Sequence, residues 1–156
     1  MKNTRLTLSE DKRNKVAESL NIVIVDLIDL SMQTLQAHWA AIGPRFKSFH
    51  EHMDELLAVY RVQVDEIGER MLALGVVPNG QSHVVVKHTE LEPIPDGFIQ
   101  SDDLITMLAD RLAAVARRIR SQQAIVCEID PASDDLLIGL IEQLEKQLWM
   151  LQAIES

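Results

Sequence analysis

The chain has 156 residues, 47% of them hydrophobic, which is enough for one domain with its own core. Its 24 acidic residues outnumber the 15 basic ones, and the net charge of −9 argues against a general polyanion binder and suits a protein that attracts cations. The single cysteine, Cys127, excludes an intrachain disulfide and fits a reducing compartment. The polar first residues predict no signal peptide, and the most apolar run is too short and too charged to span a membrane, so a cytoplasmic protein is expected.

Helical spacing dominates the first part of the chain. Residues 1–6 are expected to form a short flexible tail, and the capping-box spacing of residues 7–10 predicts the start of a helix that runs to about Ala41. The apolar surface of this helix is wide, which suits a bundle helix that also meets a neighbouring subunit. A Gly-Pro pair then breaks the pattern. Apolar residues spaced about 3.6 apart predict a second helix from Phe46 to Leu74, with Gly75 as its stop.

The second half of the chain begins with a long connection. Residues 76–100 hold three prolines and two glycines, so the helices on either side need not be antiparallel neighbours. A third helix opens with Ser101 and two aspartates, and Pro131 and Ser133 begin a fourth. The sequence therefore predicts one all-α domain over residues 1–156, a four-helix bundle with a long crossover between its second and third helices.

Four potential metal ligands lie on one arc of the predicted second helix. With His50 at 0° and about 100° per residue, Asp54 falls near 40°, Asp65 near 60° and Glu69 near 100°. Asp54 and Asp65 are nevertheless separated by roughly 16 Å along the helix axis, whereas metal–ligand bonds are only about 2 Å long. One copy of the helix therefore cannot close both ends around one ion.

Two copies of this helix could do so if they packed antiparallel across a two-fold axis. The ligands then meet in two pairs that share one midpoint: His50 with Glu69, and Asp54 with Asp65. The midpoint lies beside Val59 and Tyr60, and such a dimer makes two identical sites, each joined by His38 from the end of the preceding helix. Taken one at a time, the same residues are more often solvated charges or structural histidines than ligands.

The sequence also contains an extended motif, H-W-x-x-x-G-x-x-F-x-x-x-H-x-x-x-D followed by D-x-x-x-E-R, that resembles the Dps proteins, the miniferritins. The motif residues in this chain are His38, Trp39, Gly43, Phe46, His50, Asp54, Asp65, Glu69 and Arg70. The resemblance extends over nearly the whole chain and includes residues 145–150 in the last helix. One departure is Ala40, where the family commonly has asparagine. The resemblance implies a ferritin-like four-helix subunit with a short extra helix in the crossover, assembled into a hollow dodecamer.

The resemblance further implies iron sites at the two-fold interfaces. His38, His50 and Asp54 would come from one subunit, and Asp65 and Glu69 from its partner. The site would oxidise Fe(II), with hydrogen peroxide preferred over dioxygen, and the ferric product would be stored as mineral. The adjacent Trp39 would serve as a nearby electron source or, equally well, as interface packing. Two imidazoles and three carboxylates without a thiolate also suit manganese or zinc.

Two other functions are weighed against this one. A non-catalytic, DNA-compacting protein would need basic tails, and the candidates are Lys2, Arg5, Lys12, Arg13 and Lys15. Against a net charge of −9, direct DNA binding is not favoured. A diiron site inside one bundle would use Glu-x-x-His pairs, and the sequence has none.

An acidic cluster precedes and begins the fourth helix. Helix capping accounts for Asp134 and Asp135, while in the resembled family this region lines three-fold pores that admit cations. Asp135 is the first candidate for such a pore and Asp130 the second. His52 and Glu66 point away from the ligand arc and are excluded from the site.

Overall fold

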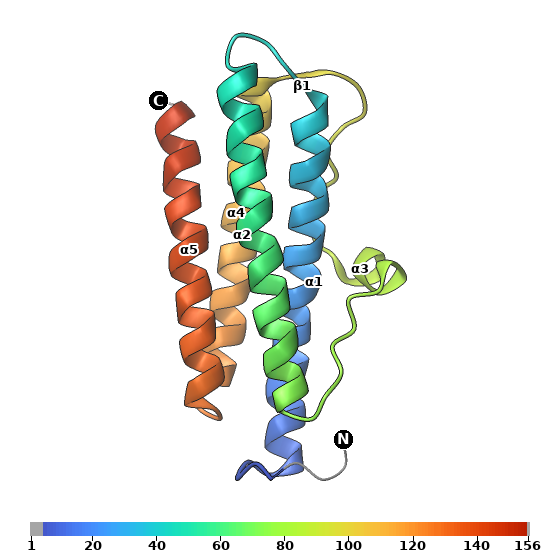
Figure 1. The fold of residues 1–156 in the computed structure, drawn as a ribbon, viewed down its shortest axis with the longest axis vertical. Helices are drawn as coiled ribbons and strands as arrows, with labels where there is room; N and C mark the ends of the chain where they lie inside the picture. Colours follow the sequence, from blue (N-terminus) through green and yellow to red (C-terminus); the bar gives the residue numbers. More distant parts are fainter. Residues whose placement is uncertain (1–4, 156) are drawn as a thin grey trace.

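The computed structural model describes residues 5–155 and contains four long helices, one short helix and two very short strands in that range. The elements in chain order are α1 (Glu10–Ala40), β1 (Ala41–Ile42), α2 (Phe46–Ala73), α3 (Ser82–His88), β2 (Ile99–Gln100), α4 (Ser101–Val126) and α5 (Pro131–Glu155). The long helices lie side by side as an elongated bundle, with α3 beside α1 (Figure 1). The predicted all-α four-helix bundle is confirmed.

The start of the first helix differs from its prediction. The helix begins at Glu10, and Ser9 takes the N-cap position with extended backbone angles and no side-chain hydrogen bond. The predicted capping box of residues 7–10 therefore does not form, because Ser9 occupies the place that the spacing assigned to Thr7. Most of the predicted tail, residues 1–4, lies outside the described residues.

The bundle core is built from one apolar stripe on each long helix. α1 packs mainly against α2, and α4 mainly against α5, while α1 also contacts α4. Leucine supplies much of the stripe on α1, at Leu20, Leu27 and Leu30, all almost fully buried. Repetition of apolar residues every three or four positions aligns them on one side of each helix, which explains why four helices close around a shared interior.

The C-terminus of α2 is closed as the sequence predicted. Gly75 has a φ of 85°, a backbone conformation that residues other than glycine rarely adopt. The Gly75 N–H donates to the Leu72 carbonyl and the Val76 N–H to the Met71 carbonyl, which is the hydrogen-bond pattern of a Schellman cap. This cap turns the chain out of the bundle and into the crossover.

The crossover returns the chain along the bundle, so that α2 and α4 run in the same direction (Figure 1). On its way it forms α3, which packs on α1 and buries Val85. It ends in a parallel pairing of Ile99 with Ala41, which joins β2 to β1 at the end of the bundle where α2 begins. None of the helices in residues 5–155 combines the length and apolar character that crossing a bilayer requires.

Candidate metal centre

Three of the predicted ligands come together in one chain. His38 lies in the last turn of α1, and His50 and Asp54 lie in the first three turns of α2. Within residues 5–155 they are the one group of histidine, cysteine and acidic side chains whose ligand atoms gather, all within 4.8 Å of one another. The short link between α1 and α2 brings these helix ends together, so residues separated by twelve positions can share a site.

The two histidines hold each other in place. Nδ1 of His38 lies 3.2 Å from the carbonyl oxygen of His50, and Nδ1 of His50 lies 3.2 Å from the carbonyl oxygen of His38. Their rings stack with centroids 3.6 Å apart. Because a carbonyl oxygen only accepts, each Nδ1 carries the hydrogen in this arrangement, and each Nε2 keeps a lone pair for a metal ion. Asp54 approaches the same pair, with Oδ1 3.5 Å from Nδ1 of His38.

The other two predicted ligands do not reach this cluster within one chain. Asp65 and Glu69 are exposed side chains on the second half of α2. They line an open groove of about 610 Å³ between α1, α2 and the start of the crossover, together with apolar residues that include Ile28, Val62 and Leu72. The four predicted ligands on α2 thus fall into two groups that are separated along the helix, as the helix geometry predicted.

One detail of the predicted pairing needs correction. Tyr60 was expected beside a two-fold axis, but its side chain is only 1% exposed and packs in the bundle core. Six residues of helix rotate it about 240° from Asp54, onto the opposite face. Burial raises its pKa above the usual range, although a hydrogen bond with Thr34 acts against this rise. The exposed side chains at that level of the helix are Ala58 and Arg61.

Trp39 is a surface residue beside the cluster. Its side chain is 64% exposed and borders a shallow hollow that it shares with Phe98. The centroid of the Phe46 ring lies 5.0 Å from that of the His50 ring. His52 lies outside the cluster and has Glu55 as its neighbour, with 3.5 Å between Nδ1 and Oε2.

The acidic residues near the fourth helix have different surroundings. Asp130, the second pore candidate, is 6% exposed, and its Oδ2 accepts hydrogen bonds from Nη2 of Arg70 and from the Ser133 hydroxyl, both at 2.5 Å. Burial alone would raise the pKa of Asp130, but the hydrogen bonds from Ser133 and Arg70 and the guanidinium charge lower it. Asp130 therefore links α2 to the start of α5 within one chain, which makes it a weaker pore candidate than Asp135.

The remaining acids of this cluster stay nearer the surface. Asp134 accepts a hydrogen bond from Gln123 on α4. Asp135 is exposed and remains the pore candidate. Sequence reasoning assigned Arg70 no role beyond its place in the motif, although its guanidinium links α2 to the α4–α5 corner. No spacing rule could have found that contact, because Arg70 and Asp130 are 60 positions apart.

Comparison with known proteins agrees with this architecture. A family model described as a ferritin-like domain matches residues 17–155. The chain is 32% identical over 155 residues to the DNA protection during starvation protein of Agrobacterium fabrum, covering 96% of this chain and 93% of that protein. It is 31% identical over 141 residues to the fine tangled pili major subunit of Haemophilus ducreyi, covering 88% of this chain and 73% of that protein.

A solved structure adds the same result at the level of the fold. The Dps of Microbacterium arborescens, solved in what its description calls the high iron form, superposes with a TM-score of 0.89. It is 26% identical, and the match covers 95% of this chain and 97% of that one. The chain belongs to the Dps family of ferritin-like proteins.

Proposed function

We propose that this protein oxidises Fe(II) at sites shared between two copies of the chain and stores the ferric product inside a hollow oligomer. The cluster of His38, His50 and Asp54 is the observation that carries the proposal, because its two imidazoles leave Nε2 free to bind a metal. Carboxylates and imidazoles together suit Fe(II), and the same donors would accept zinc or manganese. A related Dps described in a high iron form supports iron as the cargo.

The second half of each site would come from a partner copy. Asp65 and Glu69 are exposed on the same helix as His50 and Asp54, and they border an apolar groove that a second copy could cover. An antiparallel pairing of two α2 helices would bring the halves together twice, once on each side of the two-fold axis. A dodecamer built from such dimers, and a cytoplasmic location, belong to the same proposal.

The proposed reaction needs an oxidant that accepts two electrons. Two Fe(II) ions each give one electron to hydrogen peroxide, whose O–O bond breaks, and with two protons it leaves as two water molecules. Asp54 and Glu69 would hold the first iron most firmly. His38, His50 and Asp65 would complete the site and support a second, more weakly held ion. Trp39, the neighbour of His38 in the chain, would serve as an electron source, and its exposure equally suits packing against a neighbour.

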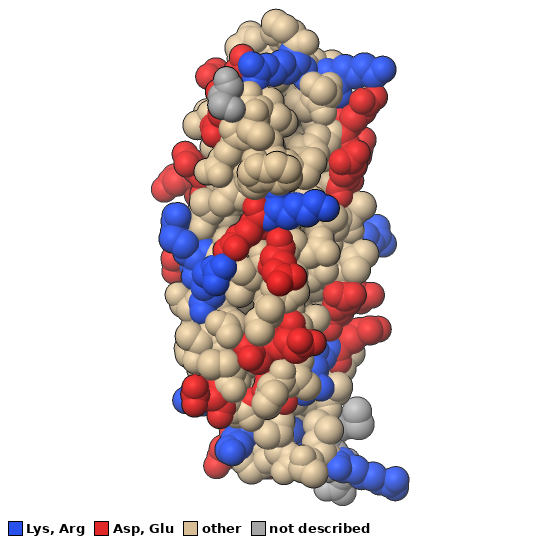
Figure 2. Space-filling model, turned by 90° about the vertical axis from the view of Figure 1, so that its left-hand side faces the viewer, with Lys and Arg blue, Asp and Glu red and all other residues tan. Residues whose placement is uncertain are grey.

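Surface charge supports the delivery of cations. Acidic side chains are spread over the height of the face that α5 contributes to, with basic side chains scattered between them (Figure 2). Asp135 would add one carboxylate per subunit to a cation pore. DNA compaction is less favoured. Lys2 lies outside the described residues, and Arg13 uses its guanidinium to donate to the Leu8 carbonyl.

Substitution of one ligand from each half tests the site. Asp54→Asn and Glu69→Gln should each slow peroxide-dependent Fe(II) oxidation by at least tenfold, because each removes a charged ligand while nearly preserving its shape. The rate is followed by the absorbance of ferric iron after peroxide is added, and size-exclusion chromatography verifies that the oligomer is intact.

The matched control is Glu66→Gln, an exposed carboxylate beside Asp65 that points away from the ligand arc. This variant should oxidise iron at the wild-type rate. Wild-type rates in both ligand variants would reject the proposed site. An equal loss of rate in the Glu66 control would show that the wrong side chains were assigned as ligands.

A further inference from the structure

A buried carboxylate lies under the crossover, far from the metal cluster. Asp26 on α1 is 1% exposed, and no donor in the described chain is aligned to hydrogen bond either of its oxygens. The nearest opposite charge is Arg118 of α4, whose Nε is 3.0 Å from Oδ2. A buried charge with one imperfect partner is costly, and the cost falls when the group takes up a proton.

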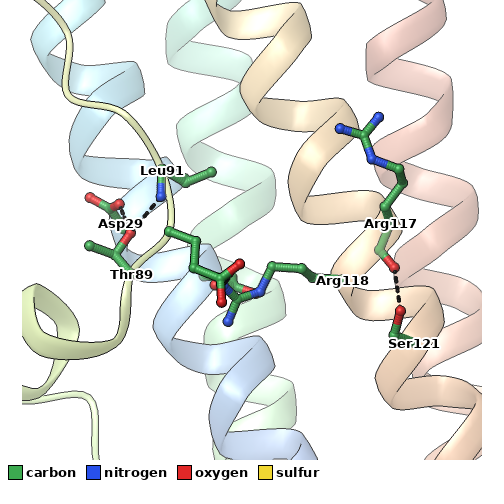
Figure 3. A network of polar contacts seen from close by, with 8 residues as sticks. Asp29, Thr89, Leu91, Arg117, Arg118 and Ser121 are labelled. Atoms are coloured by element: carbon green, nitrogen blue, oxygen red, sulfur yellow. Dashed lines mark hydrogen bonds and ion pairs between the residues drawn. The ribbon is translucent and has the colours of Figure 1, made fainter.

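Arg118 links this carboxylate to the crossover. Its Nη1 lies 2.7 Å from Oε2 of Glu90, an exposed residue just after α3. Arg118 extends from α4 toward α1 and the crossover, on the side where Asp29 meets Thr89 (Figure 3). A cavity of about 460 Å³ borders the same place and is lined by Val25, Glu90, Arg118 and His88 among others. The crossover here thus rests on a charged pair and an incompletely filled space.

Neighbouring contacts fasten the crossover on either side of Asp26. The Thr89 hydroxyl donates to Asp29 one turn along α1 and accepts from the Leu91 N–H. Arg111 of α4 donates to the carbonyl oxygens of Glu92 and Pro93. Asp26 differs from these contacts, because its charged carboxylate pays a desolvation cost in the closed form that water would reduce in the open form.

We propose that the protonation state of Asp26, paired with Arg118, controls how firmly residues 82–92 dock on the bundle. This segment would detach from the bundle more readily at neutral pH than in mild acid. The charged groups around Asp26 are Asp29 on α1, Arg118 on α4 and Glu90 on the crossover, with His88 at the neighbouring cavity. This inference concerns the motion of the crossover and is independent of the proposed iron chemistry.

The direction of the effect follows from the two forms of the protein. Burial raises the pKa of Asp26 from 3.8 to about 6, against the lowering by Arg118, and Glu90 and Asp29 add to the rise. In the open form, water reaches the carboxyl and its pKa returns toward 3.8. The closed form therefore binds the proton more tightly, and acid favours closure. Between pH 5 and pH 7.5 these two pKa values give a roughly tenfold increase in the opening equilibrium constant.

Amide hydrogen exchange of the intact oligomer tests this. Peptides covering residues 82–92 are followed at pH 5 and pH 7.5, and the rates are corrected for the intrinsic effect of pH. In the wild type, the opening equilibrium constant should be about tenfold larger at pH 7.5 than at pH 5. Asp26→Asn should abolish this difference because the amide does not titrate. Asp96→Asn, an exposed carboxylate in the same crossover, is the matched control and should keep it.

Glu90→Gln gives a second readout on the surface of the protein. Loss of the Glu90 charge lowers the pKa of Asp26, so the pH at which opening rises should move down. The proposal is overturned by equal wild-type protection at both pH values, or by a rise that persists in Asp26→Asn. It is also overturned if peptides of α5 change by the same factor, because the event would then be global unfolding.

Discussion

Asp26 and Asp130 are both buried carboxylates beside an arginine, and their contacts give them opposite effects on stability. Asp130 accepts hydrogen bonds from both Arg70 and Ser133. Asp26 has an ion pair without hydrogen-bond alignment. The pKa is lowered in the first case and raised in the second, where burial dominates. Burial outweighs the single arginine at Asp26, whereas the hydrogen bonds from Ser133 and Arg70 and the guanidinium charge outweigh burial at Asp130.

Asp130→Asn should therefore destabilise the protein by about 2 kcal/mol at pH 7, because Arg70 loses its buried counter-charge. A lowered pKa means that Asp130 contributes stability above the unfolded value of about 4, and that this is lost as pH falls through the folded pKa. Urea unfolding at pH 7 and at acidic pH measures both effects. The exposed Asp135→Asn should change little at either pH, and an equal loss there would contradict the assigned role of Asp130.

Periodicity along one helix was a sound guide at the residue scale, and contacts between helices were not predictable. About 100° per residue sufficed to place the four side chains on one arc, and a rise of about 1.5 Å per residue separated His50 and Asp54 from Asp65 and Glu69. The reciprocal hydrogen bonds between His38 and His50 depend on how the ends of α1 and α2 pack together, which residue spacing along one helix does not predict. The same limit hid the Arg70–Asp130 pair.

The helices themselves are the best-predicted elements. Their apolar stripes and the glycine after α2 identified them, since both signals are local. The errors lie where local signals compete or are weak, as at the start of α1, where two residues could cap the helix. The pairing of β1 with β2 was missed because it joins two-residue segments that lie far apart in the sequence.

Substitution of Gly75 tests the cap of α2, and substitution of Gly139 inside α5 provides the comparison. Gly75→Ala should destabilise the protein by about 1 kcal/mol, because alanine is strained at a φ of 85°. Gly139→Ala should instead stabilise it by up to about 1 kcal/mol, since Gly139 lies inside α5 and an added Cβ would have nothing within 4 Å. Thermal unfolding of both variants gives the comparison. A stabilised Gly75 variant would contradict the cap.

At the scale of the whole molecule, the proposed shared site makes a prediction that a single-chain site does not. Asp54→Asn damages the first half-site of a chain and Glu69→Gln the second. When the two variants are co-assembled, a mixed pair has one site with both halves damaged and one with both intact. Random mixing should therefore restore about a quarter of wild-type Fe(II) oxidation, because half of the pairs are mixed and half of their sites work.

The measurement compares co-assembled oligomers with a simple mixture of the two preformed variants. The preformed mixture should stay as slow as its components. Failure of co-assembled oligomers to regain activity would mean that each site is built from one chain, whatever the single variants do.

Because the half-sites are far apart along α2, the proposed oxidation rate per chain depends on the protein concentration. On the proposed pairing, a newly synthesised chain leaves iron untouched until it encounters a second, so working sites form in a second-order process. Dilution below the dissociation constant of the pair would reduce the oxidation rate per chain, whereas a self-contained site would keep a constant rate.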